Sequence, residues 1–375
     1  MSDKENQLTE SVLDMRRRLD ALDLQILELI AERQALVTRI GERKHRDGKA
    51  LRDFRREREV IELGMQRAES LGLSGDIARD IMERLIHHSL SKQEQRQIVA
   101  SGHGAGRTAL VIGGLGRMGD WLARYLDSLG YAVEIADPGE GETLFPRVEN
   151  WLGSDLNHDL IAVCAPLRVS NLILQQLADR RPAGLVFDIG SLKGPLAQGL
   201  ASMREAGCRI ASVHPMFGPG ELMLSGRHIL LVDVGNGDAL AEARELFAHT
   251  AAECVELGLR EHDEVMGWVL GLSHLMNIAF AAAISESGES VPLLRDISST
   301  TFDHQMRVAA NVVSENPHLY FEIQAGTHPA SGAAGVFAQS LDRLVEAISA
   351  GDEDAFVNIM NQARSHLQHK DGEKE

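Results

Sequence analysis

The stretch Thr108-Ala-Leu-Val-Ile-Gly-Gly-Leu-Gly-Arg-Met-Gly119 decides the fold of the central part of this chain. Its first five residues are typical of a buried strand, and the amphipathic segment that follows it to Leu129 predicts a helix. Between the two, glycines at this spacing allow a tight turn and let backbone N–H groups approach a pyrophosphate closely. The stretch therefore predicts a dinucleotide-binding turn formed by Gly114, Gly116, Arg117, Met118 and Gly119.

A second strand predicted at 132–136 ends at Asp137, 18 residues past Gly119. A carboxylate at this distance is expected to accept a hydrogen bond from the ribose 2′-hydroxyl of a dinucleotide. Asp137 also opens an acidic segment that runs to Glu142 and would repel a 2′-phosphate. The pattern therefore favours NAD over NADP as the cofactor. The alternative interpretation is a glycine-rich turn with an incidental surface Asp.

Further strands, alternating with helices, are predicted at 159–164, 184–188, 209–213 and 228–234, which indicates a doubly wound α/β sheet. Ligands of such sheets bind outside the carboxyl ends of the strands. The residues expected there are Ala165 and Pro166 beside the cofactor, then Gly190 to Lys193, and then His214 to Pro219. His214 is the leading catalytic candidate, because histidine can accept a proton near neutral pH. A lone histidine at a strand end is more often structural, so that interpretation stays open.

The first proline is Pro138, so long helices are unobstructed before it, and residues 1–100 are expected to be all-α. Helices are predicted at 8–46, 52–71 and 76–100, with Asp76 as a possible N-cap of the third. The first has apolar residues at a 4-3 spacing that is sustained for nearly four heptads and needs a partner chain to cover it: Met15, Leu19, Leu22, Ile26, Leu29, Leu36 and Ile40.

Polar residues interrupt the apolar stripes of two of these helices. Arg33 fills a gap in the first, and Ser89 and Gln93 continue the face of Ile77, Ile81 and Leu85 on the third. A charged residue on such a seam destabilises it unless the charge is paired. Polar residues on two helices therefore favour a pocket over a single polar residue that only fixes the register of the helices. Residues 39–58 hold nine basic side chains against four acidic ones. This run indicates either a local anion site or a solvated face.

From about residue 260 the pattern is again helical, with helices predicted near 266–286, 302–314, 318–325 and 335–350. Small-residue, apolar helices of this kind usually form a dimerisation core. His274 lies within the first of them, either as a core histidine or as a site residue. The domains are thus predicted as 1–100 (helical), 101–107 (linker), 108–256 (Rossmann-type) and 257–375 (helical, dimerisation and substrate).

The chain has 375 residues and a net charge of −17, all of which resides in residues 101–375. The acidic balance argues against nucleic-acid binding. No uninterrupted apolar run approaches the roughly 20 residues of a membrane span, and the N-terminus lacks a signal-peptide pattern. Three scattered cysteines form neither a disulfide framework nor a metal site. A cytoplasmic enzyme that binds no metal is expected.

Over about 90 residues, the N-terminal part resembles the chorismate mutases of the intertwined, all-helical dimeric class. The resemblance is carried by Arg16, Ala21-Leu22-Asp23, Ala31-Glu32-Arg33, Lys44, Arg52-Asp53, Arg56-Glu57-Arg58, Ser89 and Gln93. It implies rearrangement of chorismate to prephenate, in which catalysis comes from holding a compact conformer and stabilising charge on the breaking ether oxygen.

The same resemblance implies a role for each polar residue. Arg33, Arg56 and the partner chain's Arg16 would bind the substrate carboxylates, because the arginine fork suits them. Lys44 and Gln93 would donate to the ether oxygen, and Ser89 would lie close to a carboxylate. Glu57 and the chain near Asp53 would hold the ring hydroxyl.

Residues 108 to about 365 resemble prephenate dehydrogenase, and with the mutase ahead of them the chain resembles the bifunctional T-protein family of tyrosine biosynthesis. The carrying motifs are Gly114-x-Gly116-x-x-Gly119, Asp188-Ile-Gly-Ser191-Leu-Lys193, His214-Pro-Met-Phe-Gly-Pro219 and Glu261-His-Asp263 followed by Ser273-His274. The resemblance implies NAD-dependent oxidative decarboxylation of prephenate to 4-hydroxyphenylpyruvate. His214 would bind the substrate hydroxyl and help remove its proton, Ser191 would lie beside that hydroxyl and the nicotinamide, and His274 would line the pocket.

One position departs from the family pattern. Relatives carry a carboxylate-binding Arg six residues before a proline turn, and counting back from Pro317 places Asn311 there. Arg307, one helical turn earlier, is predicted to take over this role, with Arg295 as another candidate. A change of substrate to arogenate is a further alternative.

Two readings of the whole chain compete with the bifunctional one. In the first, the chain is a dehydrogenase of another small hydroxy acid and the N-terminal helices serve only for dimerisation. In the second, those helices are a regulatory ligand-binding module. The polar set of Arg33, Lys44 and Gln93 argues against both readings.

Overall fold

A computed structural model of the chain describes residues 11–46, 53–221, 224–326 and 332–368. The contacts between residues divide the chain into two compact units. The first unit comprises residues 1–162, 215–231 and 241–255, and the second comprises residues 163–214, 232–240 and 256–375. Lys49 and Arg52 of the basic run lie outside the described residues.

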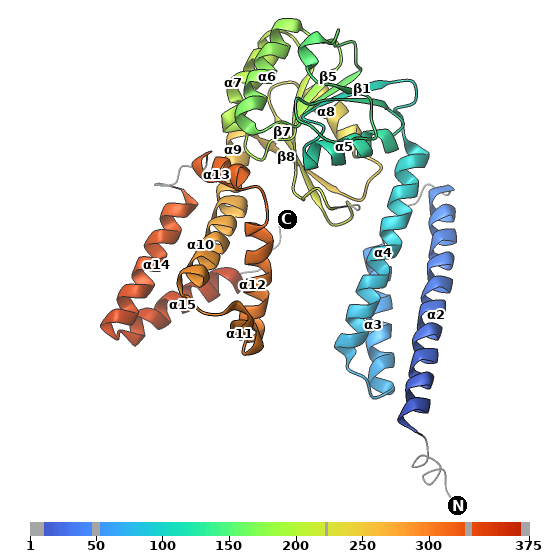
Figure 1. Cartoon of the computed structure of the whole chain (residues 1–375), viewed down its shortest axis with the longest axis vertical. Helices are drawn as coiled ribbons and strands as arrows, with labels where there is room; N and C mark the ends of the chain where they lie inside the picture. The colour runs from blue at the N-terminus through green and yellow to red at the C-terminus, as the bar shows by residue number, and fades with distance from the viewer. Residues whose placement is uncertain (1–10, 47–52, 222–223, 327–331, 369–375) are drawn as a thin grey trace, which may run out of the picture. The chain divides into compact units, whose positions relative to one another are not determined.

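Three helices form the N-terminal part, as predicted: α2 (Val12–Arg46), α3 (Phe54–Ser70) and α4 (Gly75–Ser101). Both α2 and α3 pack against α4 (Figure 1). Asp53 caps α3 by accepting a hydrogen bond from the backbone N–H of Arg56. The expectation that Asp76 caps α4 was wrong, because Ser74 lies one residue ahead of the helix and its hydroxyl accepts from the Asp76 N–H.

The central part is one sheet of eight strands: β1 (Thr108–Ile112), β2 (Ala132–Ala136), β3 (Arg147–Val148), β4 (Leu160–Val163), β5 (Leu185–Asp188), β6 (Ile210–Pro215), β7 (His228–Asp233) and β8 (Glu253–Gly258). Their order is β3-β2-β1-β4-β5-β6-β7-β8, and the pairs β1–β2, β2–β3 and β5–β6 are parallel. The order reverses direction between β1 and β4, as in a doubly wound fold. Strands β3 and β8 were not predicted, because β3 has two residues and β8 is mostly exposed.

The helices between the strands are α5 (Arg117–Ser128), α6 (Leu167–Arg180), α7 (Ala197–Glu205) and α8 (Gly237–Glu245), with short 3₁₀ turns at Trp151–Gly153 and Gly194–Leu196. The strands form the core: β4 and β5 are buried along their whole length. These continuous apolar runs are what a parallel sheet covered on both faces requires.

The C-terminal part is helical: α9 (Leu259–Met266), α10 (Ser273–Glu286), α11 (Val291–Asp296), α12 (Thr300–Val313), α13 (Pro317–Gly326), α14 (Ala333–Ala350) and α15 (Glu353–Gln368). A π-helical segment, Gly267–Leu272, joins α9 to α10. Such segments leave a backbone carbonyl without its usual partner. Here the side chain of Gln324 donates to the Gly271 carbonyl at 2.9 Å.

One stretch, Leu259–Glu286, is long and apolar enough to cross a membrane by length and composition. The sequence expectation counted only uninterrupted apolar runs and therefore missed it. The stretch contains the polar residues Ser273, His274 and Asn277. Length and composition alone are weak grounds for a span, because core helices of other proteins pass the same test.

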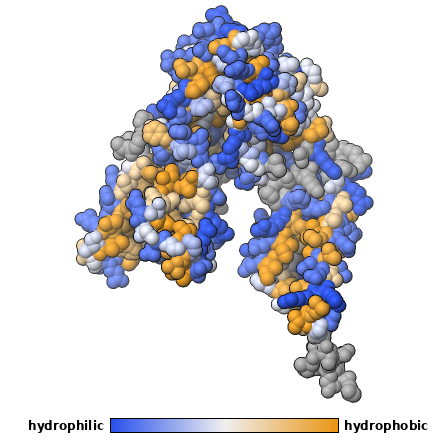
Figure 2. Space-filling model, viewed as in Figure 1, coloured by the Kyte–Doolittle hydropathy of each residue, from blue (hydrophilic) through white to orange (hydrophobic). Residues whose placement is uncertain are grey.

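Large apolar side chains remain exposed on the helical parts (Figure 2). All seven residues of the α2 seam are between 46 and 65% exposed: Met15, Leu19, Leu22, Ile26, Leu29, Leu36 and Ile40. A row of this length is far larger than the scattered apolar residues that a monomer's surface normally carries. It is a surface that needs a partner.

Candidate active sites

The turn between β1 and α5 has room for backbone but not for side chains. A Cβ atom added at Gly114 would lie 2.5 Å from the Ile135 Cβ, and one added at Gly119 would overlap the Gly113 carbonyl oxygen. Gly116 is the N-cap of α5, and the exposed Arg117 and half-buried Met118 form its first turn. The free N–H groups of a helix start attract anions. The turn therefore fits the pyrophosphate of a dinucleotide.

Asp137 lies directly after β2 and is held against the glycine turn. Its Oδ2 accepts from the Leu115 N–H at 3.1 Å and its Oδ1 accepts from the Gly139 N–H at 2.8 Å. The guanidinium of Arg147 donates to the backbone carbonyls of Asp137 and Gly139. The carboxylate is thus fixed at the strand end where a ribose diol would bind.

We expect the chain to prefer NAD, and Asp137→Ala to erode that preference. The substitution removes the acceptor for the 2′-hydroxyl, and Arg147 stands next to the vacated place to attract a 2′-phosphate. The kcat/KM for substrate oxidation should be compared with NAD and NADP on both proteins. A wild-type chain that uses NADP as well as NAD would contradict the role of Asp137.

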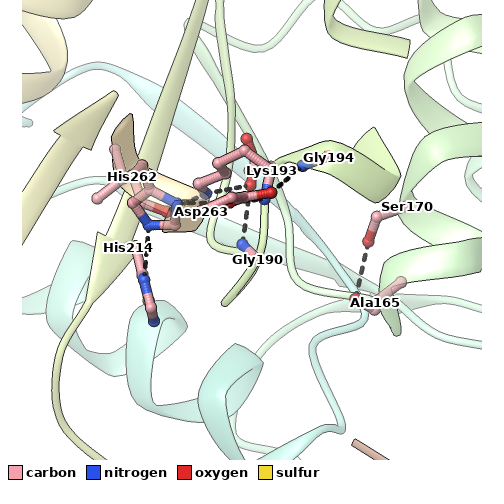
Figure 3. Close-up of polar contacts among 10 residues, drawn as sticks. Ala165, Ser170, Gly190, Lys193, Gly194, His214, His262 and Asp263 are labelled. Carbon is pink, nitrogen blue, oxygen red and sulfur yellow. Dashed lines mark hydrogen bonds and ion pairs between the residues drawn. The ribbon is translucent and has the colours of Figure 1, made fainter. Parts of the chain in front are cut away.

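Ala165 and Pro166 follow β4, as predicted. The Ala165 carbonyl accepts from the Ser170 hydroxyl at 2.7 Å, and Pro166 is the N-cap of α6 (Figure 3). Both residues lie at the carboxyl end of their strand, where ligands of such sheets bind.

His214, near the end of β6, is buried and belongs to a chain of three side chains (Figure 3). Its Nδ1 lies 3.0 Å from Nε2 of His262, and Nδ1 of His262 lies 2.7 Å from Oδ1 of Asp263. Asp263 is itself fixed, because its two oxygens accept the N–H groups of Lys193 at 2.8 Å and Gly194 at 2.5 Å. Asp263 therefore orients His262, and His262 orients His214.

The carboxylate at one end of this chain determines where each proton lies. Asp263 can only accept while it is ionised, so the Nδ1 of His262 carries the hydrogen and its Nε2 has a lone pair. That lone pair accepts from Nδ1–H of His214, which leaves the lone pair of His214 on Nε2. The outer nitrogen of His214 is thus the basic one, as a general base requires.

The local electrostatics keep this chain in that state. Burial, with the positive charge of Lys193 and the neighbouring His262, holds the pKa of His214 well below its ordinary value. Burial alone would raise the pKa of Asp263, but hydrogen bonds from His262, Lys193 and Gly194 hold it below the usual range. At neutral pH, His214 is therefore neutral and Asp263 is ionised.

Lys193 supports the same site from beneath. Its side chain is fully buried and its Nζ donates to Asp188 Oδ1 at 2.7 Å and to the Val213 carbonyl at 2.9 Å. Burial lowers the pKa of Lys193, and the charge of Asp188 opposes that shift. The ion pair holds the loop after β5 to the end of β5, and the hydrogen bond to Val213 ties the same loop to β6, one residue before His214. The half-buried Ser191 lies within that loop.

His274 is the second residue of α10, just after the π-helical segment. It is half-buried, its ring lies 4.3 Å from the ring of Tyr320, and its buried Nδ1 has no hydrogen-bond partner in the described part of the chain. Burial lowers its pKa. A neutral histidine with an unsatisfied buried nitrogen is suited to a bound polar group.

Arg307 lies exposed on α12, and its Nε makes a 3.4 Å hydrogen bond to the Asp303 carbonyl of the same helix. Asn311 and Arg295 are also exposed. The structure therefore leaves Arg307 accessible to an anion without bringing it to a defined pocket.

The polar residues that interrupt α2 and α4 face each other. Arg33 Nη1 donates to the Ser89 hydroxyl oxygen at 3.1 Å and lies 3.4 Å from the Leu85 carbonyl, and the Gln93 side chain donates to the Val37 carbonyl at 2.7 Å. Burial lowers the pKa of Arg33. The two interrupted stripes thus form one half-buried polar patch, as a pocket between helices requires.

The other candidate residues of the mutase site differ in how close to this patch they lie. Lys44 lies three turns after Arg33 on the same face of α2, and the half-buried Glu57 lies on the first turn of α3. Asp53 caps α3, and Arg56 makes a largely exposed pair with Glu59 at 3.3 Å. Arg16 lies 17 residues before Arg33 on the same straight helix, roughly 26 Å away at 1.5 Å per residue. Arg16 can therefore serve such a site only from another chain.

Three functional side chains were missed as site residues. His262, Asp263 and Lys193 stand inside the motifs quoted above, but the motifs did not say that they meet His214. Forty-eight residues separate His262 from His214, and the closeness arises from the fold. The signal available in sequence was the adjacency of His262 and Asp263 at a predicted helix start.

Three domain families match consecutive parts of the chain. Residues 15–94 match type II chorismate mutase, residues 149–256 match the nucleotide-binding domain of prephenate dehydrogenase, and residues 259–362 match its dimerization domain. The chain belongs to the bifunctional chorismate mutase–prephenate dehydrogenase family. The nucleotide-binding match begins after Asp137, so the glycine turn is assigned on its strand–turn–helix geometry.

Relatives of known identity span nearly the whole chain. The T-protein of Enterobacter agglomerans is 23% identical over 347 residues, covering 92% of this chain and 90% of the relative. The T-protein of Haemophilus influenzae is 24% identical over 368 residues, covering 95% and 92%. A crystal structure of prephenate dehydrogenase from A. aeolicus, solved with hydroxyphenyl propionate and NAD+, superposes with a TM-score of 0.53 at 18% identity, covering 70% of this chain and 97% of that one.

These matches confirm the predicted fold class: an all-helical N-terminal region, a parallel-sheet nucleotide-binding region and a helical C-terminal region. They also confirm the predicted family and both enzyme activities. The match to a nucleotide-binding domain agrees with the predicted dinucleotide cofactor, and the A. aeolicus structure holds NAD+. The roles of individual residues stay predictions.

Proposed function

We propose that this chain rearranges chorismate to prephenate in its N-terminal helices and then oxidises and decarboxylates prephenate to 4-hydroxyphenylpyruvate. The observation that carries the second activity is the chain Asp263–His262–His214, which leaves a lone pair on the outer nitrogen of a neutral histidine. The half-buried patch of Arg33, Ser89 and Gln93 supports the first activity. We propose domains at 1–100, 108–256 and 257–375, with a linker at 101–107.

In the dehydrogenase step, bound NAD would supply the hydride acceptor for the substrate carbon that carries the hydroxyl group. We assign the cofactor to Gly114, Gly116, Arg117, Met118, Gly119, Asp137, Ala165 and Pro166. His214 takes the hydroxyl proton through Nε2 as that carbon becomes a carbonyl. Ser191 and His274 orient the substrate, and loss of the ring carboxylate as carbon dioxide is driven by aromatisation.

In the mutase step the protein transfers no proton. Arg33, Arg56 and the partner chain's Arg16 hold the two carboxylates, so that the substrate stays in its compact conformer. Lys44 and Gln93 donate to the ether oxygen, where negative charge develops as the bond breaks. Asp53 and Glu57 hold the ring hydroxyl, and Ser89 lies beside Arg33 near a carboxylate.

The direct test is to mix the purified protein with chorismate, first without NAD and then with it. Loss of chorismate absorbance without NAD reports the mutase, and appearance of NADH only after NAD is added reports the dehydrogenase. A protein that oxidises supplied prephenate but never consumes chorismate would show that the helices are a non-catalytic module.

We further propose a homodimer acting in the cytoplasm on small-molecule substrates. Support comes from the match to a dimerization domain and from the half-exposed apolar seam on α2. The expected mass in solution, measured by sedimentation equilibrium, is twice that of one chain. Leu22→Glu on the seam should weaken mutase activity, because Arg16 reaches the site only from the other chain.

The replacement of the family's arginine by Asn311 gives a further prediction. Arg307 precedes it by one helical turn, so Arg307→Ala should raise the KM for prephenate strongly while Arg295→Ala should not. Both variants and the wild type should be assayed with prephenate and with arogenate. Better turnover of arogenate by the wild type would instead show a pocket rebuilt for that substrate. Shifts below about twofold in every KM would rule out both arginines.

A further inference from the structure

A cavity of ≈ 410 Å³ lies where α3 and α4 meet the segment that leads into β7. This volume is within the range of small-molecule sites, roughly 300–1,000 Å³. The helices contribute two carboxylates and three apolar side chains, and the nucleotide-binding domain contributes the rest of the wall: Glu57, Ile61, Glu83, Ile86 and Leu90, then Ser225, Gly226 and Arg227. Glu57 belongs to the mutase site proposed above, and Leu90 follows Ser89 on α4. The cavity therefore shares Glu57 with that site.

The segment is fixed to the mutase helix by one buried carboxylate. Glu94 on α4 is 1% exposed, and its Oε2 accepts from the backbone N–H groups of Leu224 at 3.0 Å and Ser225 at 3.2 Å. Its Oε1 accepts from the Ala251 N–H at 2.6 Å. A buried carboxylate is costly unless it is fully hydrogen-bonded, and three backbone donors meet that need. Glu94 directly follows Gln93 of the mutase patch on α4.

Arg227 is the positive charge among the described residues that line the cavity. Its Nη2 donates to Glu221 Oε1 at 2.7 Å, while its buried Nε has no hydrogen-bond partner among the described residues. Buried donors in native proteins are almost always paired, so an unpaired one at a cavity wall points to a bound acceptor. The guanidinium geometry suits a carboxylate.

We propose that residues 225–227 of the nucleotide-binding domain complete the mutase pocket, where Arg227 binds a carboxylate of chorismate and Glu94 holds the segment in place. The mutase substrate is a dicarboxylate, and Arg227 would add one more donor to the arginines already assigned to its two anions. The dehydrogenase part of the chain thereby takes part in the first reaction as well as the second. This inference rests on the mutase site proposed above.

The test measures chorismate rearrangement by full-length variants. Arg227→Ala should raise the KM for chorismate roughly 10–100-fold, because a hydrogen bond to a charged group is lost. Oxidation of supplied prephenate should keep its wild-type kinetics. Glu221→Gln is the matched control: it breaks the same ion pair but leaves the guanidinium, so the KM for chorismate should stay near the wild-type value. Equal losses in Arg227→Ala and Glu221→Gln would reduce Arg227 to a structural ion pair and overturn the proposal.

Glu94 is a positioning residue and needs a graded readout. Glu94→Ala should raise the KM for chorismate more than it lowers kcat, and Glu94→Gln, which keeps one acceptor oxygen, should recover part of the loss. Thermal unfolding of each variant shows whether it is folded. An unchanged KM in folded Arg227→Ala and Glu94→Ala would overturn the proposal. If Arg33→Ala were also without effect, the mutase site itself would be misplaced, whereas a large effect of Arg33→Ala alone would reject only the role of residues 225–227.

Discussion

Replacing His214 with Asn is expected to lower kcat for prephenate oxidation by about 10²–10⁴-fold, the contribution typical of a general base. Asparagine keeps a polar side chain of similar size but cannot take the hydroxyl proton. NAD affinity and chorismate rearrangement should stay near normal, because His214 belongs neither to the proposed NAD site nor to the proposed mutase site. Stopped assays of NADH formation with supplied prephenate and saturating NAD measure the effect.

The pH profile gives a second readout of His214. Because burial and the charge of Lys193 hold its pKa below the ordinary value of about 6.5, the base is already neutral at that pH. Protonation at lower pH removes the lone pair, so kcat/KM should fall on the acid side, below pH 6.5, and stay level above it. His214→Asn should lose this acid limb. A variant with the wild-type rate and profile would eliminate His214 as the base.

Asp263→Asn tests the chain behind His214. An amide can present N–H to Nδ1 of His262, which favours the opposite tautomer and places a hydrogen on the outer nitrogen of His214. We therefore expect a lower kcat with little change in the KM for prephenate. The exposed Glu264, which pairs with Arg260 at 2.7 Å, offers a matched control, and Glu264→Gln should leave kcat unchanged. Equal effects of Asp263→Asn and Glu264→Gln on kcat would argue against the role of Asp263 and His262 in orienting His214.

Replacing Arg33 with Ala is expected to nearly abolish mutase activity. Truncating one member of a desolvated charge pair costs about 2–5 kcal/mol, which corresponds to roughly 30- to 5,000-fold in kcat/KM. The structure adds that Arg33 also holds the Ser89 hydroxyl, so the loss would loosen the patch as well as remove a donor. Chorismate consumption without NAD measures the effect.

The controls for Arg33→Ala come from the same chain. Arg67 is exposed on α3 and contacts Ser70 of its own helix, so Arg67→Ala should leave mutase activity unchanged. Oxidation of supplied prephenate by Arg33→Ala should also be near wild type. Normal chorismate turnover in Arg33→Ala would show that the polar patch only sets the register of the helices.

Local patterns accounted for most of the fold. The strands at 108–112 and 132–136 were predicted with the bounds that the structure shows, because each is a short apolar run between turn residues. The two missed strands lack that signature: β3 is too short, and β8 is stabilised by pairing rather than by apolar side chains. The N-cap of α4 was misassigned because Ser74 and Asp76 are both good capping residues, and only the backbone path chooses between them.

The candidate sites were predictable to a lesser extent. Only one helix and one strand separate the glycine turn from Asp137 in the sequence. Their spacing therefore predicts that they lie side by side. The sequence placed Arg33 and Ser89 in one pocket only because polar residues interrupt the apolar stripes of both helices. His274 and Arg307 were proposed from resemblance, and their surroundings on α10 and α12 neither join them to His214 nor exclude them.

The sequence by itself determined the elements, their chemistry and the family, because helix and strand periodicity, glycine spacing and short motifs are local properties of the chain. Tertiary structure alone decided which distant side chains meet. His214 acquires its proton-accepting nitrogen from His262 and Asp263, and Arg227 reaches the cavity beside Glu57 across 170 positions of sequence. Contacts of this kind depend on strand order and on helix packing. Both are determined by burial over the whole fold, so no single stretch of sequence predicts them.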